Sequence, residues 1–287
     1  MEHRFENLPL VLVSGQARSG TTALTHAFGA HPRICSNLKE SSIVDDCAAM
    51  LRDNLERAGR LYDLTVSPEQ LALNIRRFLL HSLFPTRPTL DKSNDSTETY
   101  IREPGVPLAI STFSSLHLEN LEYVTKIFPR LVIANIYRNG VEVVASRMTH
   151  STIGRNFSFE QHCIAWSHAR DAIQWGVDKP CFVAVPHHEL LERETSNAIF
   201  RTALEKIGIV DVEACTELVH TQTVSVNNSP ELSIHSESIS SALEKRVERW
   251  RTWDRSQRLL FEKLCGETMK FFGFEIPWKS KTKNLAS

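Results

Sequence analysis

The 287-residue sequence lacks a long hydrophobic run, since no stretch of it approaches the ~20 apolar residues that a membrane-spanning helix needs. The amino-terminal segment MEHRFENLPL also lacks the extended apolar core of a secretory signal. We therefore expect a cytoplasmic protein.

The sequence also lacks an excess of positive or negative charge. The chain has 33 basic and 34 acidic side chains and a formal net charge of −1. Such a balance creates no global field that would capture nucleic acid or an anionic membrane, and neither is an expected partner. Any anion site must therefore be built locally.

The six cysteines form no C-x-x-C pair and have no regular spacing. This pattern indicates neither a zinc site nor a disulfide framework, so reduced and mostly packed thiols are expected. No metal site is predicted.

Four runs of the sequence are almost continuously apolar, and each is followed by a helical pattern. They are residues 10–15, 107–111, 131–137 and 181–185. Apolar strands separated by helices are typical of an α/β fold, with a mostly parallel central sheet and helices on both of its faces. Ligands of such folds bind beyond the carboxyl ends of the strands, which directs attention to the loops after Val13 and Tyr137.

The remainder of the chain is interpreted around this sheet as a single domain over residues 1–287. Residues 42–84 have a helical pattern, and residues 86–106 are rich in Pro, Gly, Ser and Asp. We expect a helical insertion and a long loop that can act as a lid, together over about 42–106. The basic end, residues 279–287, is expected to be a solvated tail.

The segment SGQARSGTT ends the first predicted strand and opens the first predicted helix. Gly15 and Gly20 have the spacing of an ATP-binding phosphate loop, but Thr21 stands where that loop needs a lysine. Arg18 supplies a cation instead, although an isolated arginine in a turn is often merely exposed. Backbone amides at a helix start still suit a phosphate, whereas the apparatus for a metal-bound triphosphate is missing.

A second cationic strand end lies at Arg138. An aspartate at the end of a strand would hold the metal in a nucleoside triphosphatase, and here the run LVIANIY continues into arginine. Ser146 follows eight residues later, about two turns into the next predicted helix. A guanidinium and a hydroxyl in this arrangement can hold one terminal phosphate, although a small residue at Ser146 also permits close packing. The two motifs predict a site for two separate anions without a metal between them.

Taken together and in this order, GQARSGTTAL and YRNGVEVVAS resemble the two nucleotide motifs of the sulfotransferases that use 3′-phosphoadenosine 5′-phosphosulfate (PAPS). The continuation ALTHAFGAHPRICSNLKE is most similar to the tyrosylprotein and carbohydrate branches of that family, and VPHHELLE and the closing helical segment also resemble it. The resemblance implies a P-loop NTPase-like sulfotransferase fold. It also implies transfer of a sulfuryl group from PAPS to a hydroxyl or amine of a small-molecule or carbohydrate acceptor, by metal-independent in-line displacement that releases adenosine 3′,5′-bisphosphate (PAP).

The resemblance also implies roles for individual residues. Those expected to grip the 5′-phosphosulfate are Arg18, Ser19, Gly20, Thr21 and Thr22. Arg138 and Ser146 would bind the 3′-phosphate, and Arg18 would neutralise charge on the leaving group.

Glu40 resembles the catalytic base of those two branches. A carboxylate can deprotonate an acceptor, but an acidic residue before SSIVDD is also favoured by the dipole of a helix that starts there. The lysine that many relatives carry after the third strand is absent from ISTFSSLHLEN, and Lys92 and His117 are candidates to replace it. His187 and His188 stand where the family more often has a tyrosine, and are either structural or in contact with adenine.

Two other functions stay open at this point. One is a P-loop kinase or NTPase, which the absent lysine and the absent acidic strand end disfavour. The other is a non-catalytic PAP-binding protein of the same fold, which the loss of the family lysine allows.

Overall fold

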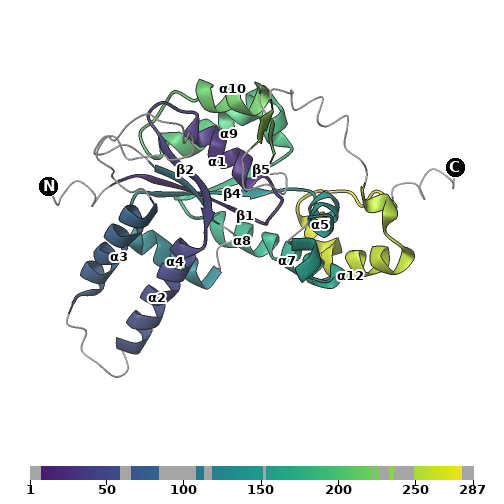
Figure 1. Cartoon of the computed structure of the whole chain (residues 1–287), viewed down its shortest axis with the longest axis horizontal. Coiled ribbons are helices and arrows are strands. Elements are labelled where there is room, and N and C mark those ends of the chain that lie inside the picture. Colours follow the sequence, from purple (N-terminus) through teal and green to yellow (C-terminus); the bar gives the residue numbers. More distant parts are fainter. Residues whose placement is uncertain are drawn as a thin grey trace.

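A five-stranded parallel sheet forms the centre of the molecule (Figure 1). The computed structural model describes residues 8–58, 66–83, 108–112, 118–150, 153–221, 223–225, 233–235 and 249–279. The strands are β1 (Leu10–Gly15), β2 (Cys35–Ser41), β3 (Leu108–Thr112), β4 (Leu131–Tyr137) and β5 (Phe182–Pro186). They lie in the order β2-β3-β1-β4-β5 and every pairing is parallel. The predicted α/β fold is confirmed.

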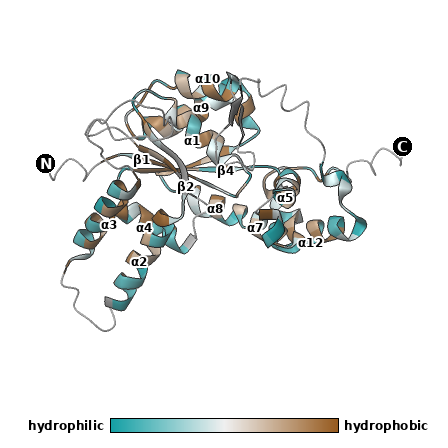
Figure 2. Ribbon diagram, in the orientation of Figure 1, coloured by the Kyte–Doolittle hydropathy of each residue, from teal (hydrophilic) through white to brown (hydrophobic). Residues whose placement is uncertain are grey.

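The central strand β1 is apolar throughout because both of its faces are covered. Leu10 and Leu12 point into one hydrophobic cluster, and Val11 and Val13 point into another. Alternate residues of a strand face opposite sides of a sheet, so this run of four apolar residues serves two cores at once. In Figure 2 β1 is accordingly hydrophobic, while much of α2 (Ile43–Ala58) is hydrophilic.

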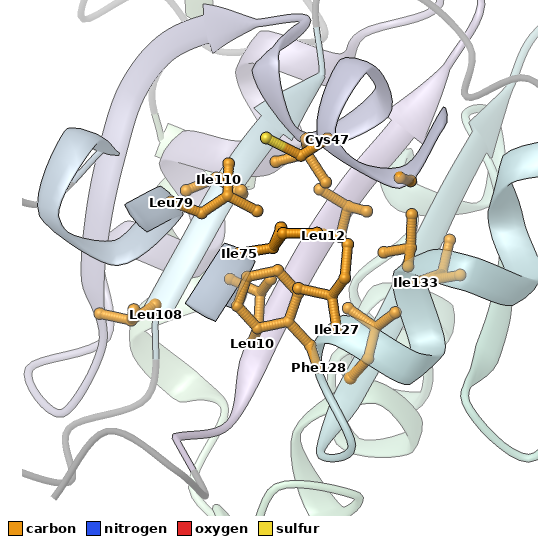
Figure 3. Close-up of a cluster of buried hydrophobic side chains, with 14 of the residues drawn as sticks. Leu10, Leu12, Cys47, Ile75, Leu79, Leu108, Ile110, Ile127, Phe128 and Ile133 are labelled. Carbon is orange, nitrogen blue, oxygen red and sulfur yellow. The ribbon is translucent and has the colours of Figure 1, made fainter. Parts of the chain in front are cut away.

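The face of the sheet below Leu10 and Leu12 is covered by the helical insertion and two further helices. These are α2, α3 (Pro68–Leu83), α4 (Leu118–Ile127) and α8 (Ala169–Gly176). Figure 3 shows Ile75 and Leu79 of α3 beside Leu10 and Leu12, with Cys47, Ile127 and Phe128 closing the cluster. The predicted helical insertion is therefore present, while the predicted lid over residues 86–106 lies outside the described residues.

The opposite face is covered by α1 (Thr21–Gly29), α9 (Arg193–Glu205) and α10 (Glu213–Thr221) (Figure 1). Phe28 of α1 and Phe200 of α9 are fully buried and meet edge to face, with ring centroids 5.3 Å apart. This packing fixes α1, and therefore the loop that precedes it, against the sheet.

A third cluster lies beyond the sheet, where α5 (Gly140–Met148) packs with α7 (Phe159–Ser167) and α12 (Arg255–Phe271). Its largest members are Trp166, Trp253 and Phe261, all buried. The described residues also contain three short helices, α6 (Ile153–Asn156), η2 (Glu189–Leu191) and η3 (Arg249–Thr252).

The four predicted strands agree with the observed ones to within one residue at each end. The sequence prediction missed β2 because CSNLKES is largely polar and the strand lies at the edge of the sheet, paired with β3 alone. It also missed a small antiparallel pair in the polar connector, β6 (Thr223–Ser225) with β7 (Ser233–His235). Among the helices that the structure describes, none has both the length and the apolar character needed to span a bilayer.

Candidate functional site

The loop between β1 and α1 is shaped by its two glycines. Gly15 has φ +154°, and a Cβ atom there would lie 2.3 Å from the carbonyl oxygen of Ile136 in β4. Gly20 has φ +107°, and a Cβ atom there would lie 3.0 Å from Cδ2 of His187. Both positions therefore require glycine, for backbone conformation and for space.

The amino terminus of α1 is not capped by a side chain. Gly20 is its N-cap residue and provides no side-chain hydrogen bond. The first amide groups of a helix have no partner within the helix, and together with the helix dipole they attract anions. The Ser19 hydroxyl beside them is fully buried and has no hydrogen-bond partner among the described residues, which costs free energy unless a ligand supplies one. This end of α1 therefore suits an anionic group.

Arg18 connects the loop to α5. Its φ is +75°, and it is the one non-glycine residue with a positive φ among those the structure describes. Such a conformation is uncommon for a side-chain-bearing residue and is characteristic of functional sites. The Nε atom of Arg18 donates a hydrogen bond to Oγ of Ser146, 3.2 Å away and 128 positions later. The residues predicted from two separate motifs are thus in direct contact.

Arg138 follows β4, and two contacts with its surroundings hold it in place. Its Nε atom lies 2.7 Å from Oε2 of Glu142, one helical turn into α5. Its carbonyl oxygen accepts a hydrogen bond from Nε1 of Trp166 at 3.1 Å. A Cβ atom at Gly140 would lie 2.7 Å from the Trp166 ring, so the ring packs directly on the turn. The Asn139 side chain caps α5 by accepting from the amide of Val141 at 2.9 Å.

Positive charge dominates the described part of the site. Burial and the neighbouring Arg18 lower the pKa of His150, so this imidazole is neutral near pH 7 and adds no charge of its own. Glu142 is the acidic group paired with Arg138 there. The arrangement suits a ligand with more than one negative charge.

The comparisons with known proteins decide the family. A profile of the sulfotransferase family matches residues 9–198, about two thirds of the chain. The chain belongs to the sulfotransferase family. The matched range contains both motifs and every residue predicted for the site.

One solved structure is similar to this chain in fold, and a second was compared with it. The sulfotransferase domain of the Synechococcus PCC 7002 olefin synthase is 13% identical, with 94% of this chain and 97% of that chain covered and a TM-score of 0.50. A sulfotransferase from Alicyclobacillus acidocaldarius is 12% identical over 94% of this chain and 97% of that chain, with a TM-score of 0.40. None of the curated protein sequences compared with the chain matches it significantly.

Glu40 lies in β2, a strand that the sequence analysis did not predict, and the helix expected within SSIVDD begins just after it, at Ile43. Its backbone pairs with Ser111 of β3 after a register irregularity between Asn37 and Glu40. The carboxyl ends of parallel strands lie at the same edge of the sheet, so Glu40 shares an edge with the Arg18 loop, with β3 between them. Lys92 and His117, the candidates for the missing lysine, lie outside the described residues.

The histidines of the sulfotransferase have distinct positions. The His187 amide donates to the carbonyl of Tyr137 at 2.8 Å, which ties the loop after β5 to that after β4 and places the imidazole over Gly20. The ring of His188 instead meets Phe274, with centroids 5.6 Å apart. His31 is buried and its Nδ1 atom accepts from the amide of Arg33, as expected for a turn residue.

Sequence reasoning missed Glu142 and Trp166 as parts of the site. Glu142 had a detectable signal, because an acidic residue four positions after an arginine lies on the same face of a helix. Trp166 had none, since its contact with Arg138 depends on how α7 packs against α5.

Replacing Gly15 with alanine should destabilise the protein by about 1–3 kcal/mol, because the added methyl group meets backbone that cannot move aside. Gly266→Ala is the matched control: no atom lies within 4 Å of the added Cβ there, and alanine favours the surrounding helix by up to about 1 kcal/mol. Urea denaturation measures both. Equal stability of Gly15→Ala and the wild type would contradict the loop geometry.

Proposed function

We propose that the protein transfers the sulfuryl group of PAPS to a hydroxyl or amine of a small-molecule or carbohydrate acceptor, releasing PAP. The observation that supports this most strongly is the 3.2 Å hydrogen bond from Arg18 to Ser146. It joins the motif assigned to the 5′-phosphosulfate to the motif assigned to the 3′-phosphate. A nucleotide with an anion at each end fits such a composite site better than one with a single phosphate chain.

The described residues are compatible with PAPS. Ser19 offers a buried hydroxyl that has no partner among the described residues, and the start of α1 at Gly20 directs backbone amide groups toward an anion. Arg138 lies just before α5, and Ser146 lies in the second turn of that helix. Together they would hold the 3′-phosphate. When bound, PAPS supplies an activated sulfuryl group and a good leaving group.

The protein's own residues would then position the reactants and balance charge. Arg18 is suited to neutralise the negative charge that develops on the leaving oxygen. Glu40 would act as the base that removes the proton from the acceptor. It shares the edge of the sheet with the loop, and a carboxylate is a suitable base. Holding the acceptor in line with the bond that breaks supplies a further part of the rate enhancement.

A kinase or NTPase is the weaker alternative. Thr21, and not lysine, is the first residue of α1, and β4 runs into Arg138 with no acidic residue at its end. A metal-bound triphosphate would need both of those groups.

PAP without metal should stabilise the protein, by about 2.7 kcal/mol at 100 times its dissociation constant. Arg138→Ala should remove most of this effect because one end of the ligand loses its charged partner. Thermal unfolding with PAP, and separately with ATP plus Mg²⁺, measures it. Stabilisation by ATP that requires Mg²⁺, together with none by PAP, would contradict the proposed donor.

Glu40→Gln should retain PAP binding and lose about 10²–10⁴-fold in turnover, because an amide cannot accept the proton. Release of PAP from PAPS, in a screen of small alcohols, amines and sugars as acceptors, measures turnover. The exposed residue Glu56 provides the control variant Glu56→Gln, which should behave as wild type. Unchanged turnover in Glu40→Gln would remove Glu40 from the mechanism, and PAP binding by a wild type that turns over no acceptor would favour the non-catalytic alternative.

Glu142→Ala should weaken PAP binding even though it removes a negative charge near an anion site. The reason is that the carboxylate, 2.7 Å from Nε, holds the Arg138 guanidinium in place. Calorimetric titration of PAP tests this prediction. Glu122 forms a similar ion pair with Lys126, one helical turn away, so Glu122→Ala is the control variant. Tighter binding by Glu142→Ala would show that Glu142 opposes the ligand and does not position Arg138.

A further inference from the structure

Two consecutive residues of α5 reach the phosphate loop. Ser146 accepts the hydrogen bond from Arg18, and Arg147 donates from Nη1 to Oε1 of Gln16 in a long hydrogen bond of 3.5 Å. Gln16 is the first residue after Gly15, so α5 contacts the loop near its beginning and near its middle. Arg147 was not among the residues predicted from the motifs.

The Arg147 side chain is a buried cation. The residue is 8% exposed and Gln16 is equally buried, and none of the residues that the structure describes accepts a hydrogen bond from Nε of Arg147. Within the part of the chain that the structure describes, no carboxylate pairs with this guanidinium. Burial lowers the pKa of Arg147, which reflects how unfavourable the isolated charge is there.

The neighbouring side chain from α7 does not compensate that charge. His162 is buried, and neither of its ring nitrogens has a hydrogen-bond partner in the described part of the chain. Burial, with a contribution from Arg147, lowers the pKa of His162 to about 4. The imidazole is therefore neutral near pH 7, and the positive charge of Arg147 lies uncompensated behind the loop.

We propose that Arg147 is a positioning residue of the nucleotide site, which holds the loop through Gln16 and carries a charge that is compensated when an anionic nucleotide binds. The inference rests on the proposed function, because it takes the ligand to be the bisphosphate nucleotide PAP or its sulfated form. Replacing a purely structural residue would lower both the stability of the ligand-free protein and its affinity for the ligand, whereas replacing Arg147 should affect the two in opposite directions. The charge lowers the stability of the ligand-free protein and raises the affinity for the ligand.

Arg147→Met tests both quantities. Methionine fills much of the same space without charge, so the ligand-free protein should melt at the same or a higher temperature. Its affinity for PAP should fall by about tenfold or more, since a cation near several negative charges is lost. Arg147→Lys, which keeps the charge, should recover part of that affinity.

A matched control is available in α3, away from the nucleotide site. Arg76 of α3 is 6% exposed, and its Nε atom donates to the carbonyl oxygen of Ile127. Arg76→Met should lower the melting temperature and leave the PAP affinity of the folded protein unchanged. Replacing Arg147 should therefore weaken PAP binding without lowering the melting temperature, whereas replacing Arg76 should lower the melting temperature without weakening PAP binding.

Each outcome decides a different statement. Wild-type affinity for PAP in Arg147→Met would overturn this inference and leave the proposed function intact, whereas a wild type that does not bind PAP would overturn the proposed function. If Arg147→Met does not fold, the charge of Arg147 does not destabilise the ligand-free protein, and the statement that it does is wrong. Gln16→Met then tests the loop contact: a severalfold weaker affinity for PAP supports it, and unchanged affinity refutes it.

Discussion

The contact between the phosphate loop and α5 is the interaction on which the site depends. Arg18 has an unusual backbone conformation, and its guanidinium reaches a hydroxyl on a helix that begins more than a hundred residues later. Neither motif alone distinguishes this chain from a damaged ATP-binding loop. Their juxtaposition brings the loop that carries Arg18 into contact with the helix that follows Arg138, an arrangement suited to a ligand with two separate anionic groups.

The rest of the fold holds these two elements in register. Alternate residues of β1 serve the cores on the two faces of the sheet, which fixes the strand that ends in the loop. The edge-to-face pair of Phe28 and Phe200 fixes α1, and the aromatic cluster around Trp166 fixes α5. Because Trp166 also donates to the Arg138 carbonyl, the third core directly supports the site.

Much of this could be predicted from the sequence, for physical reasons that differ between residues. Strands covered on both faces are continuously apolar, so β1, β3, β4 and β5 were predicted closely. The edge strand β2 was not, since its polar residues have no periodic signal, and Glu40 was consequently not placed on a strand. Arg18, Arg138 and Ser146 could be found because they belong to short motifs. Gln16, Arg147 and Trp166 could not, because their contacts arise from the packing of helices that are distant in sequence.

The central claim is that the two motifs bind the two ends of one nucleotide. Calorimetric titration in the absence of divalent metal, with PAP, 5′-AMP and 3′-AMP as separate ligands, tests it most directly. If both anionic groups have their own partners, PAP should bind at least about 100-fold more tightly than either monophosphate, since each charge-assisted contact contributes a substantial part of the affinity. Equal affinities for PAP and 5′-AMP would show that Arg138 and Ser146 do not bind a 3′-phosphate, and would contradict the account.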